Sequence, residues 1–552
     1  MLRRREAHSG RAPGRHLEGC APRGRTASTL ATVRLTVRLV RRGALVLAAV
    51  LAAYVVIEVQ AFEAGYPDAA SRELVFALAQ DPVLRVLQGL PASSSIAGLV
   101  LWDAGWILQL VVAVWMIATT GRLLRGDEES GRAELVLAGP VSERGVLLAQ
   151  LGVMLGTGAL AGSAVAVALA ASGCAVVGSV QFGALVAGVA ATAVAMTAVL
   201  SQVLATRGRV VGTAATLLGA ALVVRMVANS AASREWLAWF TPLGWNDQLR
   251  PYGEDRPLAL LVPVGVVTAL AVVAVVLRRR RDLGAGLGRE GRARSVSLGL
   301  SSPIAFAART TAWTLVAWMA GLASYGVVAG GLLPSLEDFI EPGGTYEEML
   351  EAFGMELGDL ERGFVGFMGM VLGVVVCVYA AWRIGAARLE EATARLEHLL
   401  VRPVQRWRWL GGHVLLAVAS VLLLATTSGA AIWAGAAAVG ADLALGDAFA
   451  SVYNTLPAVA VFLGVAVLLL GIVPRLTVPV GASAPLLLYV LQVVGPPLEW
   501  PDWVLSLSPF HHLGNAPLDP VSTTAAVAMV AIGLAAGIAG AIAFQRRDVI
   551  GA

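Results

Sequence analysis

Long apolar stretches alternate with short polar ones along the whole chain. A helix that crosses the hydrocarbon layer of a bilayer needs about 20 predominantly apolar residues. Twelve such stretches can be placed, and together they predict an all-α polytopic membrane protein with six helices in each half. The predicted spans are approximately residues 43–62, 96–120, 145–172, 177–204, 210–230 and 258–277, followed by 311–333, 363–383, 408–434, 451–473, 476–494 and 523–544.

The composition fits this class and limits the chemistry. Charged residues make up 14% of the chain, against about 25% in soluble domains. All 41 basic residues are Arg, because Lys does not occur. This excludes a phosphate-binding loop of the GxxxxGK[ST] type, whose Lys must reach the nucleotide phosphates. If ATP drives this protein, a different chain binds it. The three cysteines match no metal-binding or redox spacing.

The distribution of Arg predicts the orientation of the chain. Loops on the cytoplasmic side of a membrane protein are enriched in basic residues. If the N-terminus is inside, the Arg-rich segments all fall on the inner side. The outer loop from Pro334 to Arg362 instead holds nine carboxylates and a single Arg. The pattern therefore predicts that both termini are cytoplasmic.

The chain divides into four predicted regions. Residues 1–33 are expected to form a disordered basic tail, and residues 34–290 the first half. A cytoplasmic linker at 291–303 then leads to the second half, residues 304–552. The first span follows a basic amphipathic stretch, Thr32 to Arg42. We interpret this span as an uncleaved anchor, because its apolar run exceeds that of a signal peptide.

A polar segment after the second span is repeated in the second half. The two copies are residues 122–140 and 388–403, and positions 125–140 align with 388–403 at a spacing of 263 residues. Repetition favours a docking element for a partner protein over a solvated loop that only preserves topology, although the loop remains the alternative. The candidate coupling residues are Arg125, Asp127, Glu128, Glu134 and Pro140 in the first copy, and Arg388, Glu390, Glu391, Glu397 and Pro403 in the second.

Helical spacing predicts how these side chains are arranged. If residues 126–137 form one helix, Glu128 lies within about one turn of Arg132. Glu390 and Glu397 are seven residues apart and would share a face. A surface of this kind suits a partner groove lined with Arg and apolar side chains.

Two further sequence features occur once in each half. The sixth span is followed by RRRRDLGAG and the twelfth by QRRDVIGA. Aromatic loops, WFTPLGW and LSLSPFHH, precede the same two spans, and aromatic residues favour the membrane interface. Short helices in these loops could close an extracellular exit, with ordinary interfacial anchoring as the alternative. The candidate gate residues are Trp239, Phe240, Pro242, Trp245, Pro509 and Phe510. His511 and His512 lack further ligands nearby, so no metal site is predicted.

Two ionisable residues stand out within the spans. Asp103 and Arg225 both fall near the outer boundary of the membrane, in the second and fifth spans. Intramembrane charges are functional candidates, so a role in substrate passage is one hypothesis. Mutual pairing or partial hydration is the alternative. The third and fourth predicted spans contain no Asp, Glu or Arg, which argues against proton-coupled transport.

The first copy of the polar segment resembles a known family. Residues Glu128 to Leu135, followed by Gly139 to Ser142, are similar to the signature EExGRxELxLAxPVS of ABC-2-type exporter permeases. The double-length form resembles bacterial exporters of polyketide antibiotics, including the tetronasin-resistance type. The second copy departs from the pattern, with Ala392 and Ala394 at the positions of Glu129 and Gly131.

The resemblance implies a permease subunit in a bacterial cytoplasmic membrane. Two copies of a separate subunit would bind ATP and Mg and dock on the polar segments, and the chain itself would hold no cofactor and catalyse no reaction. The cargo would be a small hydrophobic or amphipathic compound, and no nucleic acid is involved. Export of a lipid or envelope precursor is an alternative, as is a non-transporting sensor or scaffold. A membrane-embedded enzyme would need polar residues clustered at one depth, which the sequence lacks.

Overall fold

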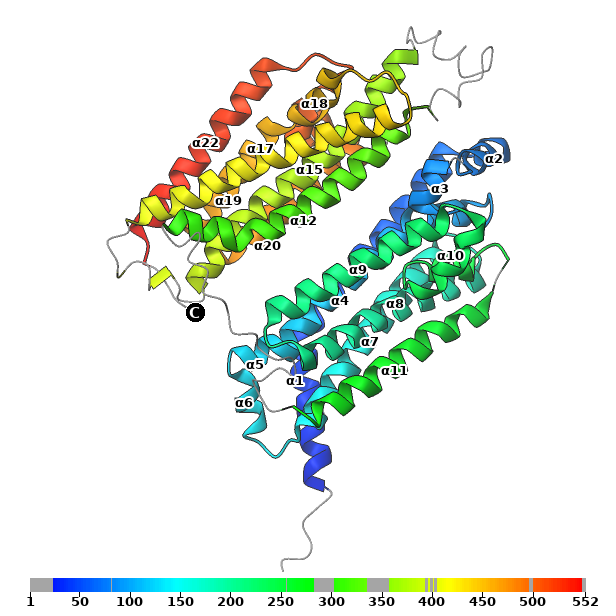
Figure 1. Ribbon diagram of the computed structural model, residues 1–552, viewed down its shortest axis with the longest axis vertical. Coiled ribbons are helices and arrows are strands. Elements are labelled where there is room, and N and C mark those ends of the chain that lie inside the picture. Colours follow the sequence, from blue (N-terminus) through cyan, green and yellow to red (C-terminus); the bar gives the residue numbers. More distant parts are fainter. Residues whose placement is uncertain are drawn as a thin grey trace, which may run out of the picture. The chain divides into compact units, whose positions relative to one another are not determined.

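The computed structural model describes residues 23–80, 82–254, 256–281, 302–334, 357–392, 396–397, 401, 405–495 and 500–548. Within these ranges all regular elements are helices, and twelve of them are long and apolar enough to cross a membrane (Figure 1). This confirms the all-α polytopic class. The chain forms two units, residues 1–293 (unit 1) and 294–552 (unit 2), and each is described by itself. The predicted linker at 291–303 and the acidic loop fall largely outside the described residues.

Unit 1 is a bundle built around one buried helix, α8. The bundle comprises α1 (Arg23–Gly65), α4 (Ile96–Gly121), α7 (Glu143–Ala171), α8 (Val176–Val203), α9 (Arg207–Asn229) and α11 (Leu261–Arg278). Helix α8 is apolar on all sides, and it packs against α4, α7, α9 and α11. A helix with this pattern belongs inside a bundle. Shorter elements are α2 (Ala69–Leu78), α3 (Pro82–Gln88), η1 (Arg122–Gly126), α5 (Asp127–Glu129), α6 (Arg132–Leu137), η2 (Ala232–Phe240), α10 (Trp245–Leu249) and η3 (Pro257–Leu260).

Helix α1 begins earlier than the sequence pattern indicates. Residues 23–33 were expected to belong to a disordered tail, but they form the first turns of α1. The buried face of the helix continues through Thr32 and Thr36 before it reaches Val40 and Leu47. Thr36 also donates a hydrogen bond from Oγ1 to the carbonyl of Thr32. Because Thr is not apolar, a search for hydrophobic periodicity does not detect this part of the face.

Unit 2 has a comparable bundle, in which α15 is the central helix. Its elements are α12 (Pro303–Gly331), α15 (Leu357–Ala392), α17 (Arg406–Ala438), α18 (Leu445–Tyr453), α19 (Leu456–Ile472), η4 (Pro474–Leu476), α20 (Thr477–Val494), α21 (Asp502–Leu505), η5 (Pro509–His512) and α22 (Thr523–Arg546). Helix α15 packs against α17, α18, α19 and α20. The fourth span of this unit is made of α18 and α19 together, with Pro457 in the first turn of α19.

Local details repeat between the units at the positions where the sequence repeats. Helices α7 and α17 begin at Glu143 and Arg406, which are 263 residues apart. In unit 1 the hydroxyl of Thr241 donates to the carbonyl of Ala221, 20 residues earlier, at 2.7 Å. In unit 2 the hydroxyl of Ser508 donates to the carbonyl of Leu488, again 20 residues earlier, at 2.9 Å. The Thr-Pro and Ser-Pro loops therefore make the same contact with the preceding span.

Close helix pairs in unit 2 depend on small residues. Helices α19 and α22 approach so closely that a Cβ on Gly540 would lie 2.5 Å from the carbonyl oxygen of Val467. Gly537 lies on the same helix, but a Cβ there would meet nothing nearer than 3.9 Å. Close backbone approach of this kind is a common basis of helix association in membranes.

These two glycines provide a matched test of the packing. We expect Gly540→Ala to destabilise the protein by about 1–3 kcal/mol, because the added methyl forces α22 away from α19. Gly537→Ala should cause no loss, since Ala favours the helix and meets open space. Thermal unfolding in mild detergent, followed by tryptophan fluorescence, measures both. Equal effects of the two substitutions would contradict the close approach.

Candidate functional site

The repeated polar segment of unit 1 is not one helix. Helix α4 continues through the π-helical turn η1 into α5, which ends at Glu129. The chain then turns at Gly131, whose φ is +72°, and α6 begins at Arg132. Residues with a Cβ rarely adopt this φ, so Gly suits the position. The predicted single helix over 126–137 is therefore wrong, and α5 and α6 differ in direction.

Glu128 lies at the centre of a buried ion-pair network. Its carboxylate accepts hydrogen bonds from Nη1 of Arg125 at 2.7 Å and from Nη1 of Arg278 at 3.2 Å. Nη2 of Arg281 is a third donor to the same carboxylate. The Glu128 side chain is 10% exposed, and that of Arg125 is 1% exposed. The carboxylate thus links the end of the second span to the end of the sixth.

The same arginines also contact α8 and the loop that follows it. Nε of Arg125 donates to the carbonyl of Ala205 at 2.6 Å, and Nη1 of Arg281 donates to the carbonyl of Ser201 at 2.7 Å. Burial, and then the charge of Arg125, lower the pKa of Arg281 to about 10. Arg281 therefore remains charged at neutral pH. Because these contacts converge from three elements, the segment is fixed to the bundle.

Arg132 forms its ion pair with Asp127, next to Glu128, with an Nη2 to Oδ1 distance of 2.9 Å, and its side chain is 63% exposed. Arg125 and Glu128, proposed from the sequence as partner-facing, are buried in their own unit and position the segment.

Unit 2 contains the same kind of link. Glu391, whose side chain is 1% exposed, accepts hydrogen bonds from Nη1 and Nη2 of Arg547 at 2.6 and 2.7 Å. Arg388 lies 3.6 Å from the same carboxylate. Glu391 is 263 residues after Glu128, and Arg547 and Arg281 each precede an Asp in the repeated RRD sequence. The two repeated sequence features are therefore joined by a buried ion pair in both units. Sequence reasoning noted both features but missed Arg278, Arg281 and Arg547 as partners.

A second network occurs beside this link in unit 2. Oε2 of Glu390 accepts a hydrogen bond from Nε1 of Trp409 at 3.1 Å and lies 3.5 Å from Nε2 of His413. Nη1 of Arg383 lies 3.2 Å from Nδ1 of the same histidine. Trp409, His413 and Arg383 are all buried. Glu390 thus contacts its own unit and does not share an exposed face with Glu397.

Other predicted coupling residues remain exposed. They are Glu134 and Pro140 in unit 1 and Glu397 in unit 2. Apolar side chains accompany them, with Leu135 78% exposed and Val401 88% exposed. Pro403 lies outside the described residues. Each described segment therefore presents a carboxylate beside an exposed aliphatic side chain, on a base fixed by buried ion pairs.

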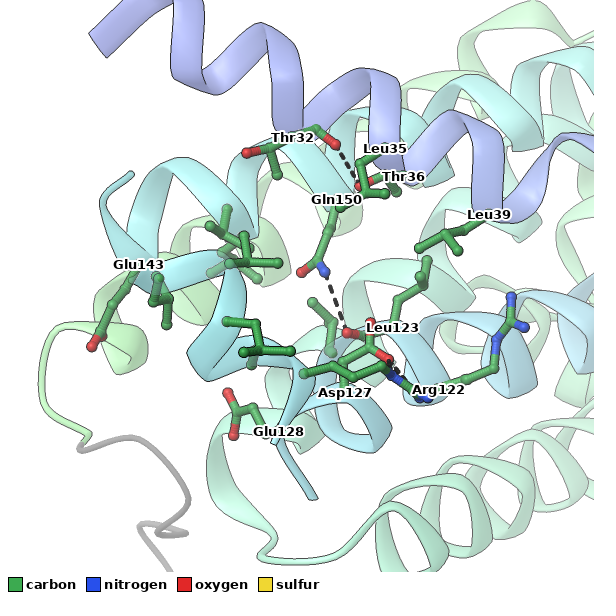
Figure 2. A pocket seen from close by; sticks show the side chains of 18 of the residues that line it. Thr32, Leu35, Thr36, Leu39, Arg122, Leu123, Asp127, Glu128, Glu143 and Gln150 are labelled. Carbon is green, nitrogen blue, oxygen red and sulfur yellow. Dashed lines mark hydrogen bonds and ion pairs between the residues drawn. The ribbon is translucent and has the colours of Figure 1, made fainter. Parts of the chain in front are cut away.

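A cavity of about 430 Å³ lies between α1 and this segment in unit 1. Figure 2 shows Thr32, Leu35 and Leu39 projecting from α1 toward the side where Leu123 and Gln150 lie. Nε2 of Gln150 donates to the carbonyl of Leu123 at 3.3 Å. The remaining lining mixes aliphatic with polar and charged side chains, and it comes mostly from η1, α5, α6 and the first turns of α7, with Gln202 of α8 and Arg278 of α11.

At the other end of unit 1, Asp103 and Arg225 do not pair with each other. Arg225 is fully buried, and its Nε donates to Oδ2 of Asp247 at 2.9 Å. Nη2 of Arg225 donates to the backbone carbonyl of Gln88, and Nε2 of Gln88 donates to Asp103 at 3.1 Å. The predicted mutual pairing is wrong, because Asp247 lies closer in the fold and Gln88 stands between the two groups. Glu58, which the sequence analysis missed, is a second carboxylate that interacts with Asp103.

The aromatic loops contain short helices, as expected, but their aromatic residues differ in exposure. Trp245 is buried, and its Nε1 donates to the carbonyl of Trp239 at 2.9 Å. Phe510 is buried against Phe462 and Tyr489. Phe240 is 75% exposed. Among the described residues, no group of three or more metal-ligating side chains occurs.

The twelve spans and the two internally fixed polar segments define a polytopic permease built from two six-span units. The chain matches the family described as "Multidrug efflux system permease Rv1217c, C-terminal domain" over residues 77–279 and 300–545, and it belongs to that family. It is 32% identical over 501 residues to the multidrug efflux system permease protein Rv1217c of Mycobacterium tuberculosis. That alignment covers 88% of this chain and 89% of the relative. The protein is thus a multi-pass membrane permease of an efflux system.

Proposed function

We propose that the chain is the permease subunit of an ATP-driven exporter of small hydrophobic or amphipathic compounds. The observation that carries this proposal is the repeated polar segment, fixed by buried ion pairs in each unit and bearing an exposed carboxylate and aliphatic side chain. The relative is named a multidrug efflux permease, which supports efflux of several compounds. Polyketide antibiotics are the cargo class that we favour, from the resemblance to exporters of the tetronasin-resistance type.

The buried ion pairs explain how a partner could move the spans. A push on Glu134 or Leu135 of α6 passes to α5, whose Glu128 is bonded to Arg278 at the end of α11 and to Arg281 just after it. Arg281 in turn donates to a carbonyl of α8. A loop without such ion pairs would move on its own and would not transmit the displacement to the spans. Separate subunits that bind ATP and Mg would supply it, one on each segment, so we propose two copies per chain.

We infer the orientation from the same segments. The repeated polar segments and the Arg-rich stretches after the sixth and twelfth spans would face the cytoplasm, where ATP is available, and both termini would lie there. The aromatic loops would then lie at the outer face of a bacterial cytoplasmic membrane. Exposed Trp239 and Phe240 would contact lipid or the exit, with Pro242 and Pro509 shaping the loops and buried Trp245 and Phe510 anchoring them. Asp103 would contact cargo, whereas Arg225 would position α3 and α10.

Affinity purification of the tagged chain from its native membrane, in mild detergent, tests the proposal. We expect an ATP-binding protein to co-purify at two copies per chain, with ATPase activity that rises when amphipathic compounds are added. Purification of the chain alone, even after chemical cross-linking, would refute ATP coupling. A non-transporting scaffold would bind the same protein without ATP-dependent flux in reconstituted vesicles.

A further inference from the structure

Four positions that line the cavity beside α1 carry different side chains in the two units. In unit 1 they are Asp127, Val146, Gln150 and Arg278. The 263-residue spacing places Glu390, Trp409 and His413 at the first three positions in unit 2, and the RRD alignment places Phe544 at the fourth. In unit 2 Trp409 contacts each of the other three.

Bulky side chains are packed at these positions in the part of unit 2 that the structure describes. Trp409 bonds to Glu390, stacks on Phe544 with ring centroids 5.5 Å apart, and lies 4.7 Å from the His413 ring. Trp409 and His413 are each 3% exposed, and Phe544 is fully buried. In unit 1 the smaller Val146 and the flexible Gln150 line the cavity. Because α7 and α17 begin at equivalent residues, Val146 and Trp409 lie at matching positions of the two helices.

The open cavity has the size and chemistry of a ligand site. Sites for drug-sized molecules typically measure about 300–1,000 Å³ and have apolar walls with few polar groups. Here ten of the twenty lining residues are apolar, among them Leu35, Leu39 and Val136. The other ten are polar or charged, among them Arg122 and Asp127, so the walls suit an amphipathic molecule and not a purely apolar one. Glu143 lies at the edge with 40% of its side chain exposed, and its ion pair with Arg278 is long, at 3.5 Å. Such an edge suits the hydrogen-bonding or cationic end of an amphipathic molecule.

We propose that this cavity binds one drug-sized amphipathic molecule of the exported class per chain. The ligand class rests on the proposed export function. Docking of an ATP-binding subunit would use the segments of both units, but in the described part of unit 2 the position of Val146 holds the bulky, buried Trp409, so we assign the cavity of unit 1 to a ligand. A ligand here would contact α1, α6 and α7 together. Its binding would therefore restrain the docking segment of unit 1 and raise ATPase activity when cargo is present.

Doxorubicin, a fluorescent amphipathic polyketide, serves as the probe. Its binding to the full chain in nanodiscs is measured by fluorescence anisotropy for wild type, Val146→Trp and Leu148→Trp. Val146→Trp introduces the side chain found at Trp409, whereas Leu148 lies two residues away and is 55% exposed. We expect at least about tenfold weaker binding in Val146→Trp, because the indole occupies the cavity, and unchanged binding in Leu148→Trp. Equal affinity in all three proteins would overturn the proposal.

A second measurement avoids dependence on folding of the variant. A photoreactive doxorubicin derivative, cross-linked to the wild-type chain, should label peptides from residues 29–40 and 132–150. Labelling confined to other regions, or a phospholipid that doxorubicin cannot displace in native mass spectrometry, would refute the assignment. If the wild-type complex does not export doxorubicin, the proposed cargo class is wrong. Saturable binding that is lost in Val146→Trp would still show that the cavity is a ligand-binding site.

Discussion

Replacing Glu128 with Gln is expected to destabilise the protein by about 3 kcal/mol. The substitution keeps the shape of the side chain but removes the negative charge that faces Arg125, Arg278 and Arg281. Arg125 and Arg281 would then be buried without a carboxylate, and Arg278 would keep only its long ion pair with Glu143. Breaking a buried ion pair costs about 3–5 kcal/mol. Thermal unfolding in mild detergent measures the loss.

Glu134→Gln provides the control, because Glu134 is exposed and six residues further along the same segment. Its unfolding should match that of wild type, as surface charges contribute about 0–1 kcal/mol. Glu391→Gln should resemble Glu128→Gln, since the Glu391 side chain is only 1% exposed and is bonded to Arg547. If Glu128→Gln unfolds like wild type, the ion-pair network does not hold the segment in place.

Reversing the two exposed carboxylates should have the largest effect on function. We expect Glu134→Arg together with Glu397→Arg to weaken association of the ATP-binding subunit at least about tenfold, because like charges would face each other across the contact. The spans should remain folded, since both side chains are exposed. The amount of ATP-binding subunit that co-purifies, and the drug-stimulated ATPase activity, measure the change.

Matched reversals at other exposed carboxylates test the specificity of this effect. Glu73 in α2 and Asp502 in α21 are exposed and lie outside the repeated polar segments. Glu73→Arg with Asp502→Arg should leave association unchanged. Full association and drug-stimulated hydrolysis in the Glu134→Arg, Glu397→Arg protein would show that the subunit docks elsewhere.

The twelve spans could be predicted from the sequence because each depends on local composition. A run of about 20 apolar residues has few alternatives to a membrane helix. The repeated segments were also visible, since Glu128 and Glu391 recur at one spacing. Their burial was not visible, because two of the three arginines that enclose Glu128, Arg278 and Arg281, lie about 150 residues further along the chain.

The wrong predictions have local physical causes. Gly131 breaks the segment, and a glycine in a helical pattern can be tolerated or can end the helix, so the sequence alone did not decide. The buried face at the start of α1 contains Thr32 and Thr36. Hydrophobic periodicity therefore did not predict that residues 23–33, eleven in all, are helical. Arg225 pairs with Asp247, which lies 22 residues further along the chain, and the sequence did not specify the path of the loop between them. The cavity likewise depends on the sizes of residues that meet only in the folded unit.

ATP-dependent flux tests the central claim most directly. The wild-type chain and its co-purified ATP-binding subunit are reconstituted into vesicles, and accumulation of doxorubicin is followed after ATP and Mg are added outside. If this chain is the permease of an ATP-driven exporter, vesicles with outward-facing docking segments should accumulate the compound, and the Glu134→Arg, Glu397→Arg complex should not. Accumulation that is independent of ATP, or equal in the two complexes, would contradict coupling through these segments.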